Sequence, residues 1–250
     1  ALFFGFFSTI LLRSLLAWEL TQDEMALAYI NLVTAICMFT TSLFSGVIID
    51  RSERRILMFI AQLVVFCAES IILILLVNDR LTYGYLMMSA VAASVAFPFI
   101  NPARTAMLVD AVGKPPLGKA TAMLTGGVNI ARMISPAAVG FLVDASDFVY
   151  GYVFLLSLHF LSLLCTTRLR EYPAAEQRQE GFVGELIKGF AYIIKNPSLG
   201  LAILVGVLPM LVVVPLQNVM VVFVEEIWNA GGRGLGLMVG TMGIGGLVGS

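Results

Sequence analysis

The chain has 250 residues, of which 59% are hydrophobic and only 12% are charged, and its mean hydropathy is +0.95. A soluble domain usually has about a quarter charged residues and roughly 45–50% apolar ones, so a soluble fold, a disordered chain and a disulfide scaffold are excluded. The net charge of −1 gives no electrostatic basis for nucleic-acid binding. The composition therefore predicts a polytopic membrane protein.

Polar residues divide the chain into eight apolar segments. Segments of about 20 residues are long enough, at about 1.5 Å per residue, to cross a hydrocarbon core of roughly 30 Å. A segment in lipid has to satisfy its own backbone hydrogen bonds and these are too long for barrel strands, so all eight are expected to be helices. They lie at 1–18, 26–49, 56–77, 83–109, 118–143, 149–167, 198–224 and 234–250. Because both ends of the sequence fall inside apolar runs, we expect a fragment of a longer protein with a truncated first helix.

Basic residues are distributed unequally between the two sets of connectors. Eleven lie in the connectors 50–55, 110–117 and 168–197 or at the adjoining helix ends, whereas only Arg80 and Arg233 lie on the other side. Lys and Arg accumulate in cytoplasmic loops, so the first set is predicted to face the cytoplasm.

The long polar connector divides the chain into two parts. Residues 1–168 are predicted to form a six-helix transmembrane bundle, 169–197 a cytoplasmic linker, and 198–250 the first two helices of a second bundle. The fold class is therefore all-α, and the layout is that of a transporter built from two repeated halves.

The second part of the linker has apolar residues at helical spacing. They are Phe182, Leu186, Phe190, Ile193 and Ile194. This pattern predicts an amphipathic helix on the cytoplasmic membrane surface, with a solvated linker as the alternative.

Three ionisable residues lie well inside apolar segments: Arg13, Glu69 and Arg132. Each opposes insertion by about 2.5–3.5 kcal/mol at a helix centre, so each is expected to face the bundle interior and to find a partner. Arg13 is expected about five residues from the outer end of its helix and Glu69 about eight, within about one turn of each other. One interpretation makes Glu69 a proton carrier, and the other makes Arg13–Glu69 a structural ion pair. Arg132, nearer mid-membrane, is interpreted as a substrate contact, with Glu69 as the rival partner.

The connector after the second segment carries a distinctive motif with the residues Gly46, Asp50, Arg51, Arg54 and Arg55. Its spacing resembles the cytoplasmic loop signature of the major facilitator superfamily, Gly-x-x-x-Asp-Arg-x-Gly-Arg-Arg, with Glu53 in place of the second glycine. We expect Gly46 to allow close approach of a neighbouring backbone, and Asp50 to interact with helix N-termini. The arginines are expected to pair with Asp110 or with lipid phosphates.

Three further stretches resemble the exporter branch of this superfamily that includes enterobactin exporters and macrolide-efflux proteins. They are 101–110 with 117–122, Trp18–Thr21, and Gly189–Pro197. In the fifth segment, Ser135, Pro136 and Gly140 belong to a stretch similar to the Gly-Pro-x-x-Gly-Gly motif of superfamily antiporters, although Ser135 and Val139 replace two glycines. A simple packing kink at Pro136 is the alternative.

The remaining reactive residues predict no catalytic or metal site. His159 is interpreted as a packed or lipid-interface residue rather than a proton relay, and a single histidine excludes a di-histidine metal site. Cys37, Cys67 and Cys165 have no CxxC spacing and are interpreted as buried small hydrophobes.

Together these observations predict a secondary transporter and not an enzyme. The resemblance implies a proton-driven exporter of amphipathic small molecules, siderophore-like or macrolide-like, in the inner (plasma) membrane. The expected partners are a small-molecule substrate, protons and the lipid bilayer, with no nucleic acid, no cofactor and a monomeric state. An importer of the same superfamily and a non-transporting helical membrane scaffold are the alternatives.

Overall fold

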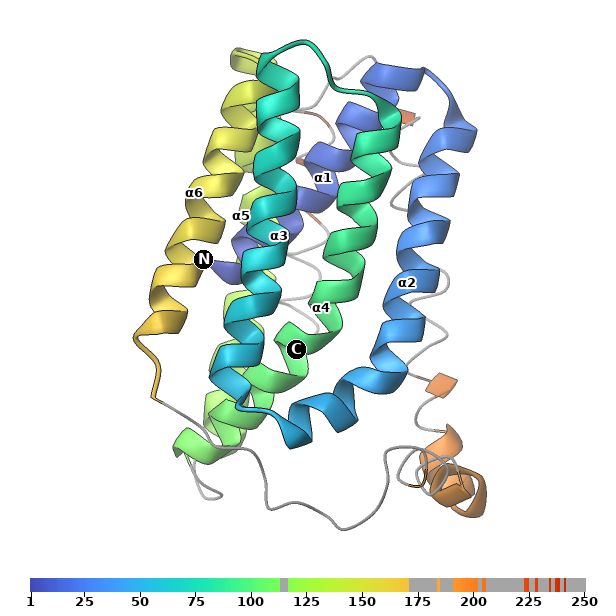
Figure 1. Ribbon diagram of the computed structural model, residues 1–250, viewed down its shortest axis with the longest axis vertical. Helices are drawn as coiled ribbons and strands as arrows, with labels where there is room; N and C mark the ends of the chain where they lie inside the picture. The colour runs from blue at the N-terminus through green and yellow to red at the C-terminus, as the bar shows by residue number, and fades with distance from the viewer. Residues whose placement is uncertain are drawn as a thin grey trace.

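The computed structural model describes residues 1–112, 117–170 and 191–201, with a few isolated residues beyond them. Six helices account for most of this part of the chain, and it contains no strand (Figure 1). They are α1 (Leu2–Thr21), α2 (Glu24–Arg51), α3 (Arg54–Val77), α4 (Tyr83–Val112), α5 (Leu117–Ala145) and α6 (Phe148–Thr167). All six are long and apolar enough to cross a membrane. The predicted all-helical fold is confirmed.

The link between α1 and α2 is shorter than the polar run 19–25 indicates. α1 continues through this run until Gln22, which has left-handed angles (φ 48°, ψ 32°) and donates its backbone N–H to the carbonyl of Trp18. Asp23 then caps α2 by accepting from the backbone N–H of Met25 at 2.9 Å. Polar side chains at the membrane surface therefore extend the helices instead of interrupting them.

The turn between α2 and α3 consists of Ser52 and Glu53. Glu53 has ordinary extended angles (φ −67°, ψ 114°), and its carboxylate accepts from the backbone N–H groups of Arg55 and Ile56 at 3.2 and 2.7 Å. A carboxylate at this position satisfies free N–H groups and interacts favourably with the helix dipole. The residue that replaces glycine in the loop motif thus starts α3.

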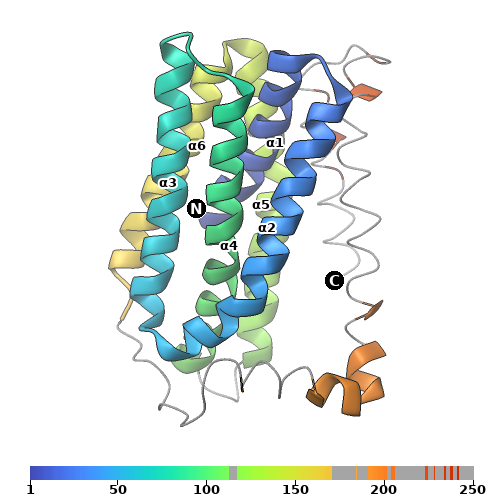
Figure 2. The ribbon, with the colours of Figure 1, turned by 45° about the vertical axis from the view of Figure 1, so that its right-hand side comes forward.

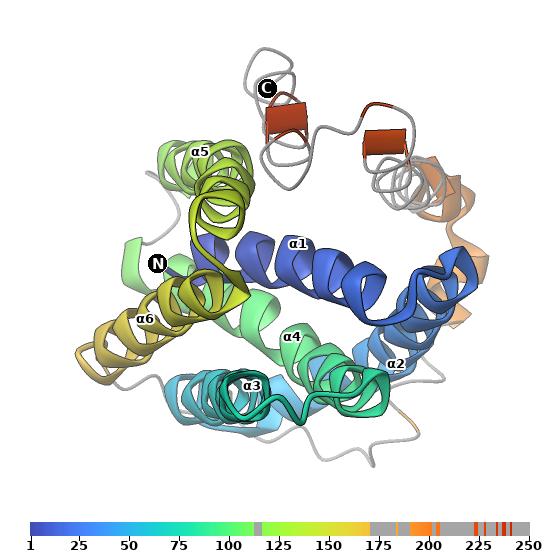
Figure 3. The same ribbon diagram turned by 90° about the horizontal axis from the view of Figure 1, so that it is seen from above.

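Helix α1 lies inside the bundle. Seen along the long axis, it runs between α5 and α4, and it also packs against α2 and α6 (Figure 3). Its residues Leu11–Trp18 are buried without interruption, on every side of the helix. A helix that is enclosed on all sides has no solvent-facing or lipid-facing stripe. α1 therefore packs against four of the other five helices, α2, α4, α5 and α6.

The other helices surround α1 and pack mainly against their neighbours. α3 contacts α4 and α6, and α4 contacts α2, so that these four helices form one continuous wall (Figure 2). Apolar side chains fill two clusters, one around Leu12, Leu86 and Tyr152 and the other around Val65 and Ile100. Many large apolar side chains on the outside of the bundle remain exposed, as expected for surfaces in contact with lipid.

The interpretation of the cysteines as buried residues is wrong. Cys67 and Cys165 are exposed and Cys37 is half-buried, all three with free thiols. In a membrane helix an apolar side chain can face lipid as readily as the core, so apolar surroundings in the sequence do not predict burial.

Most of the predicted second bundle and of the predicted linker lies outside the described residues. Phe182, Leu186 and Phe190 of the expected amphipathic helix are among them. Ile193 and Ile194 lie in a short helical stretch, residues 191–195, in which Ile194 is 80% exposed.

Candidate functional site along the central helix

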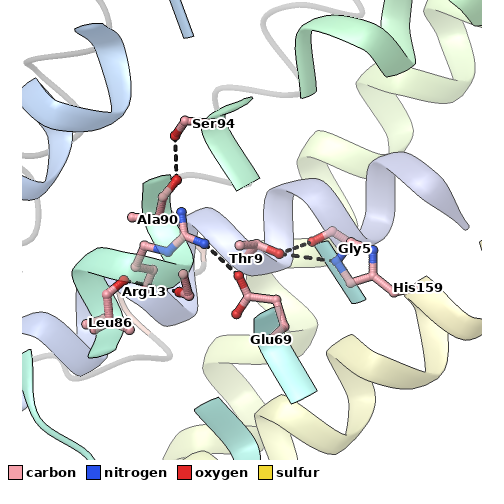
Figure 4. A network of polar contacts seen from close by, with 9 residues as sticks. Gly5, Thr9, Arg13, Glu69, Leu86, Ala90, Ser94 and His159 are labelled. Atoms are coloured by element: carbon pink, nitrogen blue, oxygen red, sulfur yellow. Dashed lines mark hydrogen bonds and ion pairs between the residues drawn. The ribbon is translucent and has the colours of Figure 1, made fainter. Parts of the chain in front are cut away.

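Polar side chains of α1 make contacts with three other helices inside the apolar bundle. Ser8, Thr9 and Arg13 are all buried. Figure 4 shows Arg13 pointing toward Glu69 of α3, and Thr9 pointing toward His159 of α6. Because buried polar groups are expensive without partners, such contacts fix how α1 sits among its neighbours.

The two buried charged residues Arg13 and Glu69 form an ion pair. Arg13 Nη2 lies 2.6 Å from Glu69 Oε1, and the two residues are only 9% and 0% exposed. Arg13 lies eight residues before Thr21 and Glu69 eight residues before Val77, so both are about 12 Å from the C-terminal ends of their helices. Arg13 is deeper than expected, because α1 continues beyond the apolar segment. The equal depth lets two buried charges neutralise each other.

This ion pair is only partly satisfied by hydrogen bonds. Glu69 Oε2 and Arg13 Nε are buried without a hydrogen-bond partner in the part of the chain that the structure describes. The hydroxyl of Tyr152, in α6, is likewise buried and unpartnered there. A bidentate arginine–carboxylate pair makes two parallel hydrogen bonds, whereas this pair makes one. The second carboxylate oxygen can therefore take up a proton or accept a further hydrogen bond.

His159 is packed against α1 and does not face lipid, with an exposed fraction of 3%. A Cβ added at Gly5 would lie 2.9 Å from its Cε1 atom, so the imidazole ring occupies the space that this glycine leaves. Thr9 Oγ1 donates to the carbonyl of Gly5 at 3.0 Å and lies 3.3 Å from His159 Nε2. Both contacts are satisfied when Nε2 carries the imidazole proton. Of the two predicted environments, the structure shows the packed one.

Arg132, in the middle of α5, is not paired with Glu69. Its guanidinium carbon lies 5.2 Å from the ring centroid of Phe7 in α1. A desolvated cation–π contact stabilises by about 2 kcal/mol. An arginine at mid-membrane opposes insertion by about 2.5–3.5 kcal/mol, so this contact offsets only part of that cost. No carboxylate among the described residues pairs with Arg132, so the compensation of its charge within them is incomplete.

A second arginine, Arg104, makes a cation–π contact with α1, one turn before Phe7. The guanidinium carbon of Arg104, in α4, lies 4.1 Å from the ring centroid of Phe3. Its Nε is buried without a hydrogen-bond partner in the described residues. The sequence places Arg104 near a helix end but does not predict this contact, because a position near a helix end does not show which ring the side chain meets.

Ser135 connects α5 directly to α1. Its hydroxyl donates to the carbonyl of Phe4 at 2.5 Å and lies 2.6 Å from Ser8 Oγ. Pro136 follows within α5 and has no N–H, so the carbonyl of Arg132, four residues earlier, receives no helical hydrogen bond from it. Both Ser135 and Pro136 are buried. The serine in this motif therefore makes an interhelical contact that the usual glycine could not make.

Two arginines of the loop motif make contacts at the start of α3, and one of them meets its expected partner. Arg54 forms an ion pair with Asp110 of α4, and Arg55 Nη2 donates to the carbonyl of Thr167 at the end of α6 at 3.1 Å. These contacts connect α3 to both neighbours at one end of the bundle. Arg51 is exposed in the last turn of α2.

The other two residues of this motif both lie at exposed positions of α2. Asp50 is exposed in the last turn of α2. Within the described residues nothing lies within 4 Å of a Cβ added at Gly46, so the expected close backbone approach is absent there. Gly46 lies on an exposed side of α2, which leaves room for a larger side chain.

A polar contact between α3 and α6 was not anticipated. Gln62 Oε1 accepts from Thr166 Oγ1 at 3.0 Å and from Ser162 Oγ at 3.4 Å, and all three side chains are buried. Two hydroxyl residues four positions apart on α6 indicate a polar stripe, but only the structure shows which helix it faces. Among the described residues no group of three or more His, Cys, Asp or Glu could hold a metal ion.

Comparison with solved structures shows proteins of a similar fold. Two similar solved structures are those of the peptide transporter POT in complex with sulfate and of a mutant of it, also with sulfate. Their TM-scores are 0.54 and 0.55, and their sequence identities to this chain are 17% and 16%. Each match covers 90% of this chain and 49% of the transporter, so the chain spans about half the length of these structures. At such identities the likeness concerns the fold alone.

The sequence comparisons give a family but no individual relative. No curated protein matches the chain. The family model of the Major Facilitator Superfamily matches over residues 1–250. With six membrane-length helices in the arrangement of one transporter half, the chain belongs to the major facilitator superfamily.

Proposed function

We propose that the protein is a secondary active transporter that uses the proton gradient across the plasma membrane to export amphipathic small molecules of siderophore-like or macrolide-like character. Family membership supports transport. The observation that supports proton coupling is the buried ion pair between Arg13 and Glu69. One of its carboxylate oxygens lacks a hydrogen-bond partner among the described residues.

Protonation gives this pair two states. A proton on Glu69 removes its negative charge, so the attraction that holds Arg13 is lost and an uncompensated guanidinium remains in the interior. Arg13 lies on α1, which packs against α2, α4, α5 and α6. A change at this one pair therefore acts on the element that most of the bundle contacts, and this is how a proton would favour one arrangement of the helices over another.

Two other features support the remaining parts of the proposal. Arg132, held against Phe7, supplies a charged and an aromatic group near mid-membrane for a substrate with polar and apolar parts. The resemblance of 101–110 to the exporter branch, and of the stretch around Pro136 to the antiporter motif, favours export over the alternative of import. The loop with Asp50 and Arg54 is proposed as a conformational gate at the cytoplasmic end.

The proposal is tested with the full-length protein produced in cells that lack their own efflux systems. Accumulation of a radiolabelled macrolide and of a catecholate siderophore is measured with and without a protonophore. We expect lower accumulation of at least one compound in producing cells, and its return to the control level when the proton gradient is removed. Equal accumulation of both compounds in producing and control cells would contradict export, and export that persists with the protonophore would contradict proton coupling.

A further inference from the structure

We propose that the face of α1 formed by Phe3 and Phe7, together with Arg104 and Arg132, is a binding site for an amphipathic organic anion. The inference rests on the proposed transport function and specifies the charge of its substrate. It predicts that the acidic group of the substrate contacts a guanidinium, while the apolar part packs against the phenylalanine rings.

The geometry places two cations on adjacent turns of one helix face. Phe3 and Phe7 are four residues apart, so their side chains are neighbours about 6 Å apart along α1. Arg104 reaches Phe3 from α4, and Arg132 reaches Phe7 from α5, at 4.1 and 5.2 Å from the ring centroids. The positive charges of Arg104 and Arg132 repel each other, and a negative charge bound between them would be attracted by both.

Both guanidiniums keep hydrogen-bonding capacity for a ligand. A guanidinium that lies on a ring face is attracted through its positive charge and does not hydrogen-bond an oxygen there. Each guanidinium has five N–H donors, whose planar arrangement matches a carboxylate. Arg104 Nε is buried and unpartnered in the described residues. Neither arginine is paired there with a carboxylate, in contrast to Arg13 and Arg54.

The site is partly open in the described part of the chain. All four side chains are half-buried, so each retains exposed surface. Arg132 lies near mid-membrane, where a guanidinium that faced lipid would oppose insertion, so its exposed surface is expected to face water or protein. A planar aromatic acid therefore suits the site, because a ring can stack beside Phe3 and Phe7 while its carboxylate meets the arginines.

The test measures binding without any gradient, using the full-length protein in nanodiscs of zwitterionic lipid. Three probes share one ring system and differ in charge: naphthalene-2-carboxylate, naphthalen-2-ylmethanol and naphthalen-2-ylmethylammonium. Equilibrium dialysis against protein-free nanodiscs corrects for partition into lipid. We expect the carboxylate to bind about tenfold or more tightly than the alcohol, and the ammonium compound to bind most weakly.

Variants then assign this preference to the two arginines. Arg104→Gln and Arg132→Gln should each weaken carboxylate binding about tenfold while leaving alcohol binding unchanged, which also shows that the variant is folded. The matched control is Arg80→Gln, which removes an exposed positive charge in the connector between α3 and α4 and should not affect binding. Equal binding of the three probes to the wild-type protein, or wild-type carboxylate affinity in both glutamine variants, would overturn the proposal.

A second measurement needs no variant. Phenylglyoxal modifies guanidinium groups, and mass spectrometry locates the modified arginines in the wild-type protein. Naphthalene-2-carboxylate, but not the alcohol, should slow the modification of Arg104 and Arg132 and leave Arg80 unaffected. Unchanged modification of both site arginines would overturn the anion site. Charge-selective binding without gradient-driven transport would contradict the proposed function alone, whereas proton-driven export without this selectivity would contradict the anion site alone.

Discussion

Two residues that depart from the superfamily motifs make hydrogen bonds that glycine could not make. Glu53 accepts from two backbone N–H groups at the start of α3, and Ser135 donates to the carbonyl of Phe4 in α1. In both places the side chain replaces conformational freedom with a specific contact, at a helix start in one case and between two helices in the other. A departure from a motif can therefore strengthen the local structure that the motif serves.

The ion pair between Arg13 and Glu69 gives a stability prediction at the residue scale. Arg13→Met or Glu69→Leu alone leaves one buried charge without its partner, and we expect the free energy of unfolding to fall by about 3–5 kcal/mol. The double variant replaces both charges by apolar side chains and should recover most of this loss. Thermal unfolding of the full-length protein in detergent measures the three variants as a double-mutant cycle.

The matched control for this cycle is Arg132→Met combined with Glu69→Leu. Arg132 does not contact Glu69, so these two effects should add. Additive losses for Arg13 and Glu69, or recovery in the Arg132 control, would contradict the pairing seen in the structure.

At the scale of elements, the sequence predicted the number and position of the first six helices but not their neighbours. Lipid-crossing length and positive charge are local properties, and both can be read from composition. Which helix lies inside is a property of packing. α1 is buried along Leu11–Trp18 whereas α2 is mostly exposed, although both are apolar.

The sequence also predicted only some residues of the candidate site. The intramembrane charges Arg13, Glu69 and Arg132 stood out because such residues are expensive in lipid. Ser8 and Thr9 did not, because hydroxyl residues are common in membrane helices and can bond their own backbone. Similarly, one phenylalanine-rich stretch of α1 offered several rings, and only the structure shows that Phe3 and Phe7 meet arginines.

Close packing of α1 against α6 predicts a selective effect of glycine substitution. Gly5→Ala would place a Cβ 2.9 Å from the buried His159 ring, so we expect a lower melting temperature of the full-length protein. Gly126→Ala, in α5, has nothing within 4 Å and should be neutral or stabilising, because alanine favours the helix by about 1 kcal/mol. His159→Ala should restore stability to Gly5→Ala. Equal effects of both glycine substitutions would show that the helices are not in close contact at Gly5.

At the scale of the whole molecule, the orientation in the membrane follows from the charge bias and gives a direct prediction. Single cysteines are introduced as Ser52→Cys, in the α2–α3 turn, and as Ser146→Cys, in the α5–α6 link, in a background without Cys37, Cys67 and Cys165. An impermeant thiol reagent added to intact cells should label only the second variant. The same reagent applied to inverted membrane vesicles is the control and should label only the first. Labelling of Ser52→Cys from outside would contradict the predicted orientation.

Proton coupling through Glu69 is measured by transport in proteoliposomes. The full-length protein is reconstituted with the labelled compound that cells export, and two rates are measured: efflux driven by an imposed pH gradient, and exchange of labelled for unlabelled compound without a gradient. Glu69→Gln keeps the shape of the side chain but cannot take up and release the proton. We predict that it loses gradient-driven efflux and retains exchange. Gradient-driven efflux at the wild-type rate in Glu69→Gln would show that Glu69 does not carry the coupling proton.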